Sequence, residues 1–246
     1  MCIAIYKPHG KQLPDSHVAE SFASNPDGAG FATICPKKGF IIQKGFFTLE
    51  EFERAFRPYA LRPALVHFRI ATSGGVNPQM CHPFSLCGGK YAMIHNGIID
   101  IKAHKGKSDT ATFADAVLTP LLERGIPHTD PALRYLVETS IGKWNKILIM
   151  DTRGKVAYFN EQSGHYTDGI WYSNESYLPP VRKVVKTGST YWSEELWDKH
   201  FGKESRQGVL LNEPRMCIYC DEPIEVHSDE LYCEDCLEYA EYCSLK

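Results

Sequence analysis

The sequence has no long apolar run and no large excess of charge of either sign. None of its apolar stretches approaches the roughly 18 residues that a membrane-spanning helix needs. The first twenty residues carry Lys7, Lys11 and Asp15, which leaves no apolar core for a signal peptide. No internal repeat and no low-complexity tract is found, which argues against repeat and disordered classes. These absences predict a cytoplasmic protein without a membrane segment.

The residues that are present suit a globular protein with a full apolar core. The chain has 246 residues, of which 43% are apolar, and a formal net charge of -3 at pH 7. This size fits one large domain and a small appendage. Nine cysteines occur, and two Cys-x-x-Cys pairs stand near the C-terminus. In a reducing compartment that spacing favours metal binding or catalysis over disulfides.

Short apolar runs between Gly, Pro and Asn residues predict a strand-rich main body. Helical spacing follows two cap residues, Ser108 and Asp130, and Pro120 is expected to kink or restart the first helix. Strands combined with a few helices predict a layered α/β or α+β domain. Three side chains of the second helix are expected to face inward: Leu133, Leu136 and Val137. The expected strands are 2–6, 30–35, 40–43, 64–70, 91–94, 146–150 and 155–159.

Polar groups recur at the ends of these strands. Arg69 lies in an otherwise apolar strand, where an unpaired guanidinium is costly, so an anionic partner is expected, and an internal salt bridge would satisfy that need. The pair Asn96-Gly97 is a typical hairpin turn, but it can also aim an amide and a backbone N–H at one point, as an oxyanion hole requires. Cys2, taken alone, is best interpreted as a small core residue at the terminus.

Five polar motifs follow Cys2 in the order NPDGAGF, HFRIATSG, CHPF, HNGII and SDT. Together with Cys2 they resemble the motifs of the class II glutamine amidotransferases, which are N-terminal nucleophile hydrolases. The resemblance spans residues 2–174. It implies an α+β fold of four layers, αββα, and a glutamine amidotransferase domain over residues 2–178.

The resemblance implies a mechanism in which the thiol of Cys2 attacks the side-chain amide of L-glutamine. Removal of Met1 frees the α-amine of Cys2, which passes the thiol proton to the departing ammonia, and water then resolves a γ-glutamyl thioester. The oxyanion is held by Asn96 Nδ2 and the Gly97 N–H. The residues implied in substrate recognition are Arg69 for the α-carboxylate, Asp109 for the α-ammonium and Thr72 for a further hydrogen bond, with His82 in support.

Two departures from the family pattern leave the physiological role open. The stretch DIKAHKGK between HNGII and SDT is short, and fewer than 75 residues follow Asn174, with no glycine-rich phosphate loop among them. The leading hypothesis is therefore a glutaminase that delivers ammonia to an acceptor synthase on another chain. The alternatives are a stand-alone hydrolase of γ-glutamyl amides or peptides, and a non-catalytic adaptor.

The C-terminal cysteines predict a small zinc ribbon over residues 214–246, joined by a linker or covering arm over 179–213. Four thiolates close a tetrahedral site with no open position, so one structural Zn²⁺ per chain is expected. Residues 214–246 contain nine acidic and two basic residues, a net charge of -7, which disfavours nucleic acid as a partner. The predicted zinc ligands are Cys217, Cys220, Cys233 and Cys236.

Overall fold

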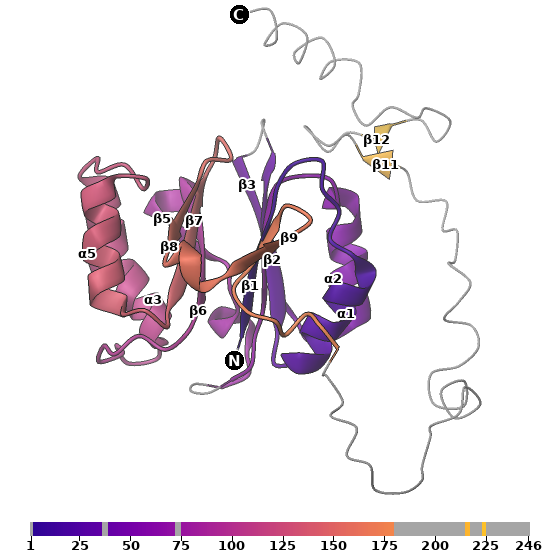
Figure 1. The fold of residues 1–246 in the computed structure, drawn as a ribbon, viewed down its shortest axis with the longest axis horizontal. Coiled ribbons are helices and arrows are strands. Elements are labelled where there is room, and N and C mark those ends of the chain that lie inside the picture. Colours follow the sequence, from indigo (N-terminus) through magenta and orange to yellow (C-terminus); the bar gives the residue numbers. More distant parts are fainter. Residues whose placement is uncertain (1, 36–38, 72–74, 180–214, 217–222, 225–246) are drawn as a thin grey trace, which may run out of the picture.

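Two antiparallel sheets form the centre of the main body (Figure 1). The computed structural model describes residues 2–35, 39–71, 75–179, 215–216 and 223–224. The larger sheet has six strands in the order β3-β2-β4-β1-β10-β9, and all of its pairings are antiparallel. Its strands are β1 (Ile3–Lys7), β2 (Ala29–Cys35), β3 (Gly39–Phe46), β4 (Ala64–Phe68), β9 (His165–Thr167) and β10 (Ile170–Tyr172).

The smaller sheet has four strands in the order β5-β6-β7-β8. Its pairings are also antiparallel. Cys2 precedes β1 and Asn96 ends β6, so two candidate catalytic residues stand at strand ends, one in each sheet. The strands are β5 (Phe84–Leu86), β6 (Tyr91–Asn96), β7 (Lys146–Asp151) and β8 (Val156–Phe159).

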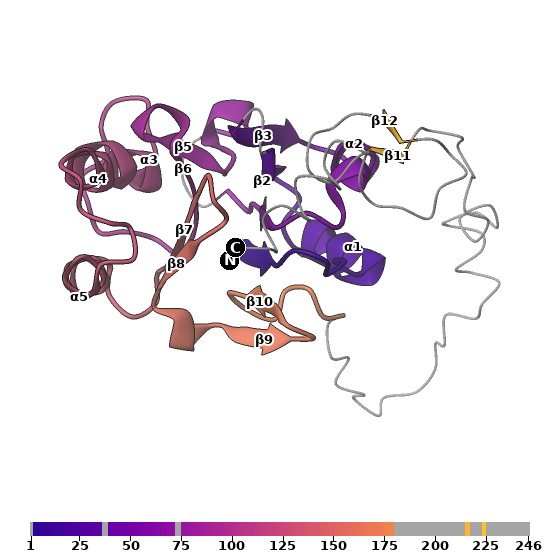
Figure 2. The ribbon, with the colours of Figure 1, turned by 90° about the horizontal axis from the view of Figure 1, so that it is seen from above.

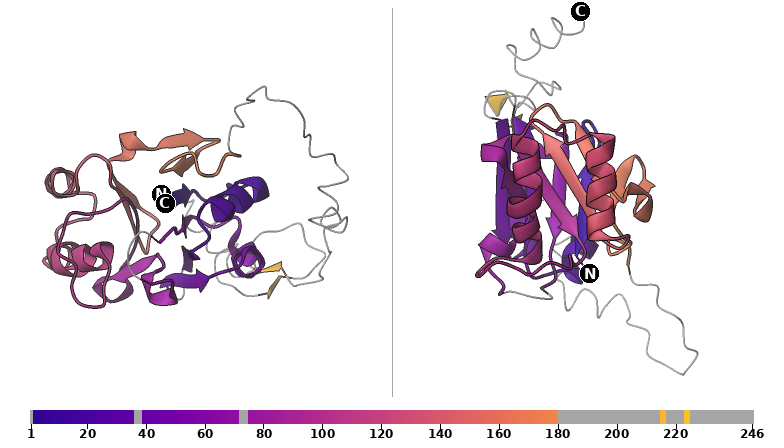
Figure 3. Two further views of the ribbon diagram at one scale, coloured as in Figure 1. Left: turned by 90° about the horizontal axis from the view of Figure 1, so that it is seen from below. Right: turned by 90° about the vertical axis from the view of Figure 1, so that its left-hand side faces the viewer.

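Helices cover the outer face of each sheet, as the views along the layers show (Figures 2 and 3). Two helices lie on the larger sheet: α1 (Asp15–Ser24) and α2 (Leu49–Phe56). The smaller sheet is covered by α3 (Asp109–Phe113), the π-helical segment η4 (Ala114–Leu118), α4 (Thr119–Glu123) and α5 (Pro131–Ile141). Single 3₁₀ turns complete the main body at η1 (Arg57–Tyr59), η2 (Pro78–Met80), η3 (Cys87–Gly89) and η5 (Glu161–Ser163).

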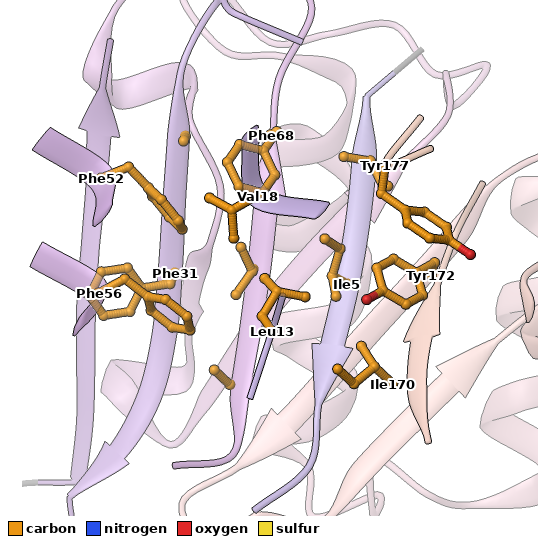
Figure 4. Packing of buried hydrophobic residues seen from close by; sticks show 14 residues of the cluster. Ile5, Leu13, Val18, Phe31, Phe52, Phe56, Phe68, Ile170, Tyr172 and Tyr177 are labelled. Atoms are coloured by element: carbon orange, nitrogen blue, oxygen red, sulfur yellow. The ribbon is translucent and has the colours of Figure 1, made fainter. Parts of the chain in front are cut away.

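Three apolar clusters fill the spaces between these layers. The first, between the larger sheet and its helices, contains the rings of Phe31, Phe52 and Phe68 (Figure 4). The second lies between the two sheets and includes Trp171 and Met150. The third lies between the smaller sheet and α3 to α5. The layers therefore follow one another as helices, sheet, sheet and helices, a mixed α+β fold as predicted.

Strand β1 shows how residue alternation builds these layers. Ile3 and Ile5 belong to the cluster under the helices, whereas Ala4 belongs to the cluster between the sheets, because successive side chains of a strand point to opposite faces. Fully burying one isoleucine contributes about 1.5–3 kcal/mol. Packing on both faces therefore holds β1 firmly, and with it the position of Cys2.

The cap residues predicted from the sequence do begin their helices. Asp130 accepts hydrogen bonds from the N–H groups of Ala132 and Leu133 at 2.8 and 3.0 Å. Ser108 Oγ accepts one from the Ala111 N–H at 3.1 Å. A side-chain oxygen at this position satisfies N–H groups that the helix leaves without partners. The second of these caps also fixes where Asp109 enters α3.

Two local predictions differ from the structure. Leu136 is 58% exposed, because α5 buries the stripe of Leu133, Val137 and Ile141, which repeats every fourth residue. Pro120, by contrast, restarts the helix as predicted, because α4 begins at Thr119 and Pro120 lies in its first turn, where the missing N–H of proline is not needed. Asn96-Gly97 does not form a tight hairpin, because β6 runs to Asn96 and its next partner begins fifty residues later along the chain, at Lys146.

The described part of the C-terminal region is one short strand pair. Strands β11 (Arg215–Met216) and β12 (Pro223–Ile224) pair antiparallel on either side of the first Cys-x-x-Cys sequence. The four predicted zinc ligands and residues 180–214 lie outside the described residues, so the zinc ribbon and the linker stay predictions. Within the described ranges, no helix is both long and apolar enough to cross a membrane.

Candidate active site

Cys2 is held where the first strand meets the end of β4. Its Sγ lies 3.4 Å from both the backbone N and the backbone O of Ile70. Its carbonyl oxygen accepts a hydrogen bond from Asn174 Nδ2 at 2.8 Å. The antiparallel register places Ile3 opposite Phe68, which brings the residues after β4 beside the thiol. The cysteine is therefore positioned by both neighbouring strands, β4 and the chain leaving β10.

The surroundings of Cys2 decide the protonation of its thiol. Burial raises the pKa of the Cys2 thiol, and the hydrogen bond from Ile70 and the positive charge of Arg69 offset part of this rise. A thiol with a raised pKa is protonated at neutral pH, and only the thiolate is a strong nucleophile. Any chemistry at Cys2 therefore requires a group that takes its proton.

One cavity collects most of the residues singled out from the sequence. Cys2, Arg69, Gly97 and Asp109 all line it, together with Ser108 and Thr110 at the start of α3. These residues come from four separate segments: the N-terminus, the end of β4, the end of β6 and the first turn of α3. The cavity thus places a thiol beside one cationic and one anionic side chain.

Backbone contacts hold the cationic side of this cavity. Arg69 is 7% exposed, its N–H donates to the Gly28 oxygen at 2.8 Å and its carbonyl accepts from the Asp27 N–H at 2.9 Å. The Asp27 carboxylate accepts from the Ala71 N–H at 2.7 Å. A Cβ on Gly28, whose φ is +133°, would collide with the sulfur of Cys81. The NPDGAG motif therefore shapes the turn that presents Arg69.

The anionic side of the cavity is anchored in a similar way. Asp109 Oδ2 accepts a hydrogen bond from the Ile99 N–H at 2.7 Å. This contact links the first turn of α3 to the loop that follows Gly97. One carboxylate oxygen is thus used to hold the loop, and a carboxylate has further lone pairs for a ligand.

His95 joins the two segments that carry Gly97 and Asp109. Its Nε2 lies 2.9 Å from Asn145 Oδ1 and its Nδ1 lies 2.8 Å from Thr110 Oγ1. Burial lowers the pKa of His95, so the ring is neutral and carries one proton. Because Asn145 Oδ1 can only accept, that proton is on Nε2, and Nδ1 accepts from the Thr110 hydroxyl.

Gly97 fits against Asn145 only because it lacks a side chain. Its φ is +143°, and a Cβ built there would lie 2.8 Å from the Asn145 Cγ and in collision with Oδ1. Asn145 cannot easily move away, since its Nδ2 donates to the Ile141 oxygen at 2.5 Å. Glycine is therefore required at this position by both the backbone angle and the contact.

The side chain of Asn96 lies deeper than Gly97. It is 1% exposed, and its Nδ2 is 2.8 Å from Ser173 Oγ. Ser173 Oγ also accepts from the Ala4 N–H at 2.9 Å. The oxyanion-hole pair predicted from the sequence is thus adjacent to the cavity, with Gly97 in its wall and Asn96 bound to a residue beside β1.

The remaining histidines of the cavity wall are neutral. His67 Nε2 donates to the backbone oxygen of His95 at 3.0 Å. The centroids of the His67 and His82 rings are 4.2 Å apart. Burial lowers the pKa of His67 to about 3 and the pKa of His82 well below its usual value. A general base near neutral pH needs a pKa close to 7, so these rings position the site and do not carry its proton.

The structure brings together Cys2, Arg69, Gly97 and Asp109, with Asn96 beside them, whereas Thr72 lies outside the described residues. Three contacts of the site come from residues to which sequence reasoning gave no role: Asp27, Asn145 and Ser173. Asp27 lies within the NPDGAGF motif and Ser173 lies within the sequence GIWYSN at 169–174, where the resemblance ends, whereas no motif pointed to Asn145. Among the residues that the structure describes, no group of three His, Cys, Asp or Glu side chains could hold a metal ion.

The chain is similar in sequence to part of a known glutamine aminotransferase. No protein-family model matches the chain. The chain is 26% identical over 202 residues to the glutamine--fructose-6-phosphate aminotransferase (isomerizing) of Aeropyrum pernix, a match that covers 77% of this chain and 32% of that protein. A solved structure of glutamine phosphoribosylpyrophosphate amidotransferase from B. subtilis is 16% identical, covers 70% of this chain and 41% of that one, and has a TM-score of 0.38. The chain therefore spans about a third of the length of its curated relative, and that relative is a glutamine aminotransferase.

Proposed function

We propose that this chain is a class II glutamine amidotransferase that hydrolyses the side-chain amide of L-glutamine to glutamate and ammonia. The observation that carries the proposal is the single cavity in which Cys2, Arg69, Gly97 and Asp109 meet from four segments. The sequence similarity to a glutamine aminotransferase supports it. A thiol in one cavity with a cationic and an anionic side chain suits an amide substrate that carries an amino acid's two α-charges.

The proposed reaction begins with the removal of Met1, which frees the α-amine of Cys2. This amine takes the thiol proton, and the thiolate attacks the amide carbon of glutamine. The tetrahedral oxyanion is stabilised by the Gly97 N–H and Asn96 Nδ2. The amine then gives its proton to the leaving nitrogen, ammonia departs, and a γ-glutamyl thioester remains. Water, deprotonated by the same amine, breaks the thioester to release glutamate and restore the thiol.

The proposed assignment of the proton to the α-amine follows from the state of the other groups. Burial keeps His67, His82 and His95 neutral with lowered pKa values. An α-amine has a pKa of roughly 7.7–8.0, which suits proton transfer near neutral pH. Among the described residues that line the cavity, the three histidines are thus poor bases, and the nucleophile's own amine is the best candidate.

Substrate recognition is proposed to use the two charged side chains of the cavity. Arg69 pairs with the α-carboxylate of glutamine, and Asp109 accepts from its α-ammonium with the oxygen that does not hold Ile99. Thr72 is proposed to add a hydrogen bond. A substrate that lacks either α-charge cannot form one of these two ion pairs, so the site would bind ordinary peptide amides less well than glutamine.

We further propose that ammonia passes to an acceptor synthase on another chain and that the ribbon holds one structural Zn²⁺ through Cys217, Cys220, Cys233 and Cys236. The first proposal is supported by the similarity to a glutamine--fructose-6-phosphate aminotransferase, whose name pairs glutamine with an acceptor. The second is supported by the spacing of the cysteines. Acceptor stimulation of ammonia formation tests the first, and metal content per chain tests the second.

The function is tested by measuring ammonia and glutamate release from glutamine. Intact mass should show that the active chain begins at Cys2, and a version that keeps an N-terminal tag should be inactive. Cys2→Ala is the matched control for the thiol. Full activity of the tagged chain, or activity that survives Cys2→Ala, would contradict the proposal.

A further inference from the structure

Ser173 connects the N-terminal strand to the side chain of Asn96. It follows β10, and its backbone N–H donates to the Ala4 oxygen at 2.9 Å. Its Oγ accepts from the Ala4 N–H at 2.9 Å and lies 2.8 Å from the side-chain amide of Asn96. Ser173 is 1% exposed. One hydroxyl thus bridges the strand that carries the nucleophile and the amide proposed to hold the oxyanion.

When Asn96 Nδ2 faces this hydroxyl, one donor and one acceptor have no partner among the described residues. Ser173 Oγ then accepts two hydrogen bonds, which uses both of its lone pairs, and among the described residues its own hydrogen has no acceptor. Asn96 Oδ1 is buried and, within the same described residues, has no hydrogen-bond partner. Leaving such a buried group unsatisfied destabilises the folded state.

The opposite orientation of the Asn96 amide resolves both problems. An amide occupies the same shape after a half-turn about its terminal bond, so hydrogen bonding decides between the two orientations. After the half-turn, the Ser173 hydroxyl donates to Asn96 Oδ1 and still accepts from the Ala4 N–H. Asn96 Nδ2 then takes the buried place of Oδ1, where no described residue accepts from it, so its two hydrogens are left for an atom of the substrate.

We propose that Ser173 is a positioning residue that orients Asn96 for catalysis. By donating to Oδ1, its hydroxyl turns Nδ2 toward the oxyanion that forms on the substrate, and by accepting from Ala4 it ties this amide to the strand of Cys2. The proposal rests on the proposed glutamine hydrolysis, because it names what prepares that reaction's oxyanion hole. Asn174 complements the arrangement, since its Nδ2 donates to the Cys2 oxygen at 2.8 Å.

The experiment compares Ser173→Thr with Ser173→Val, which have the same shape and differ only in the hydroxyl. We expect Ser173→Thr to keep kcat within about threefold of the wild type. We expect Ser173→Val to lower kcat by about ten- to a hundredfold, somewhat less than the hundred- to thousandfold typical of losing an oxyanion donor outright. KM for glutamine and alkylation of Cys2 by iodoacetamide should change little in either variant. Thr33→Val is a control for removing a buried strand hydroxyl, since Thr33 Oγ1 donates to the Pro63 oxygen at the other end of the sheet.

A double-mutant cycle with Asn96→Ala separates positioning from a general structural effect. If Ser173 acts through Asn96, Ser173→Val should cost nothing further in kcat once Asn96 is alanine. Equal kcat for the threonine and valine variants would overturn the inference, as would a double mutant whose loss is the product of the two single losses. Should both residue-173 variants fail to fold, Ser173→Ala enters the same cycle with the same expectations. A wild-type chain that releases no ammonia would overturn the proposed function itself, whereas an active wild type with an active Ser173→Val overturns only the role of Ser173.

Discussion

Gly97→Ala is the most direct test of the geometry around the candidate oxyanion hole. The substitution adds one methyl group at a residue whose φ is +143°, a region that side chains avoid. The new Cβ would lie 2.8 Å from the Asn145 Cγ, while His95 and Ile141 hold that side chain in place. The perturbation therefore combines backbone strain with a collision against a fixed neighbour.

The two parts of this cost can be estimated separately. Backbone strain at such a φ costs about 1–3 kcal/mol, and overpacking by one methyl group costs about 1–3 kcal/mol more. The free energy of unfolding should thus fall by about 2–6 kcal/mol. Because any relief shifts the Gly97 N–H, kcat for glutamine should fall by about a hundred- to a thousandfold, the usual effect of losing one oxyanion donor.

Urea unfolding and steady-state kinetics measure these two effects. The matched control is Gly125→Ala, since Gly125 has a φ of +85° and nothing within 4 Å of its would-be Cβ, so it reports strain without collision. We expect Gly97→Ala to be the more destabilising of the two by at least about 1 kcal/mol. Equal losses of stability for the two variants, or a Gly97→Ala enzyme with wild-type kcat, would refute the account of Gly97 and Asn145.

Three further outcomes are expected. Arg69→Ala and Asp109→Ala should each raise KM for glutamine at least about tenfold while iodoacetamide still alkylates Cys2, since a hydrogen bond to a charged group contributes about 1.5–3 kcal/mol to binding. An equal loss of alkylation would indicate a folding role instead. Burial lowers the pKa of Lys7 to about 7 from 10.5, so the unfolded state binds more protons between these values. The free energy of unfolding of the wild type relative to Lys7→Met should then rise by about 4 kcal/mol from pH 7 to pH 10, and a difference that does not vary with pH would argue against a neutral buried lysine. Replacing Cys217 and Cys220 by serine should release one Zn²⁺ per chain and lower acceptor-stimulated activity while leaving basal glutaminase activity unchanged; loss of the basal activity would make the ribbon part of the catalytic fold.

Much of the local structure could be predicted from the sequence because its causes are local. Strand runs and the caps Ser108 and Asp130 depend on neighbouring residues, and the structure has them where expected. Leu136 was assigned to the wrong face because helical spacing leaves a buried stripe uncertain by one residue until the sheet it packs on is known. The sequence could not decide between a hairpin turn and an oxyanion hole at Asn96-Gly97 for a related reason. Only the pairing of β6 with β7 shows that no hairpin forms there.

For the candidate site, residue types and motifs identify the chemical groups that are present, whereas the fold sets which of these groups lie together in space. Cys2, Arg69, Gly97 and Asp109 stand out by residue type and motif, and the fold then places them around one cavity. The partners that orient them do not stand out, because Ser173 is 77 residues from Asn96 along the chain and Asn145 is 50 residues from His95. The same holds for charge: a histidine's type indicates a group that titrates near neutral pH, but burial between two stacked sheets makes these rings neutral. Hydrogen bonding and desolvation depend on distance in space, and only the stacking of the layers sets those distances.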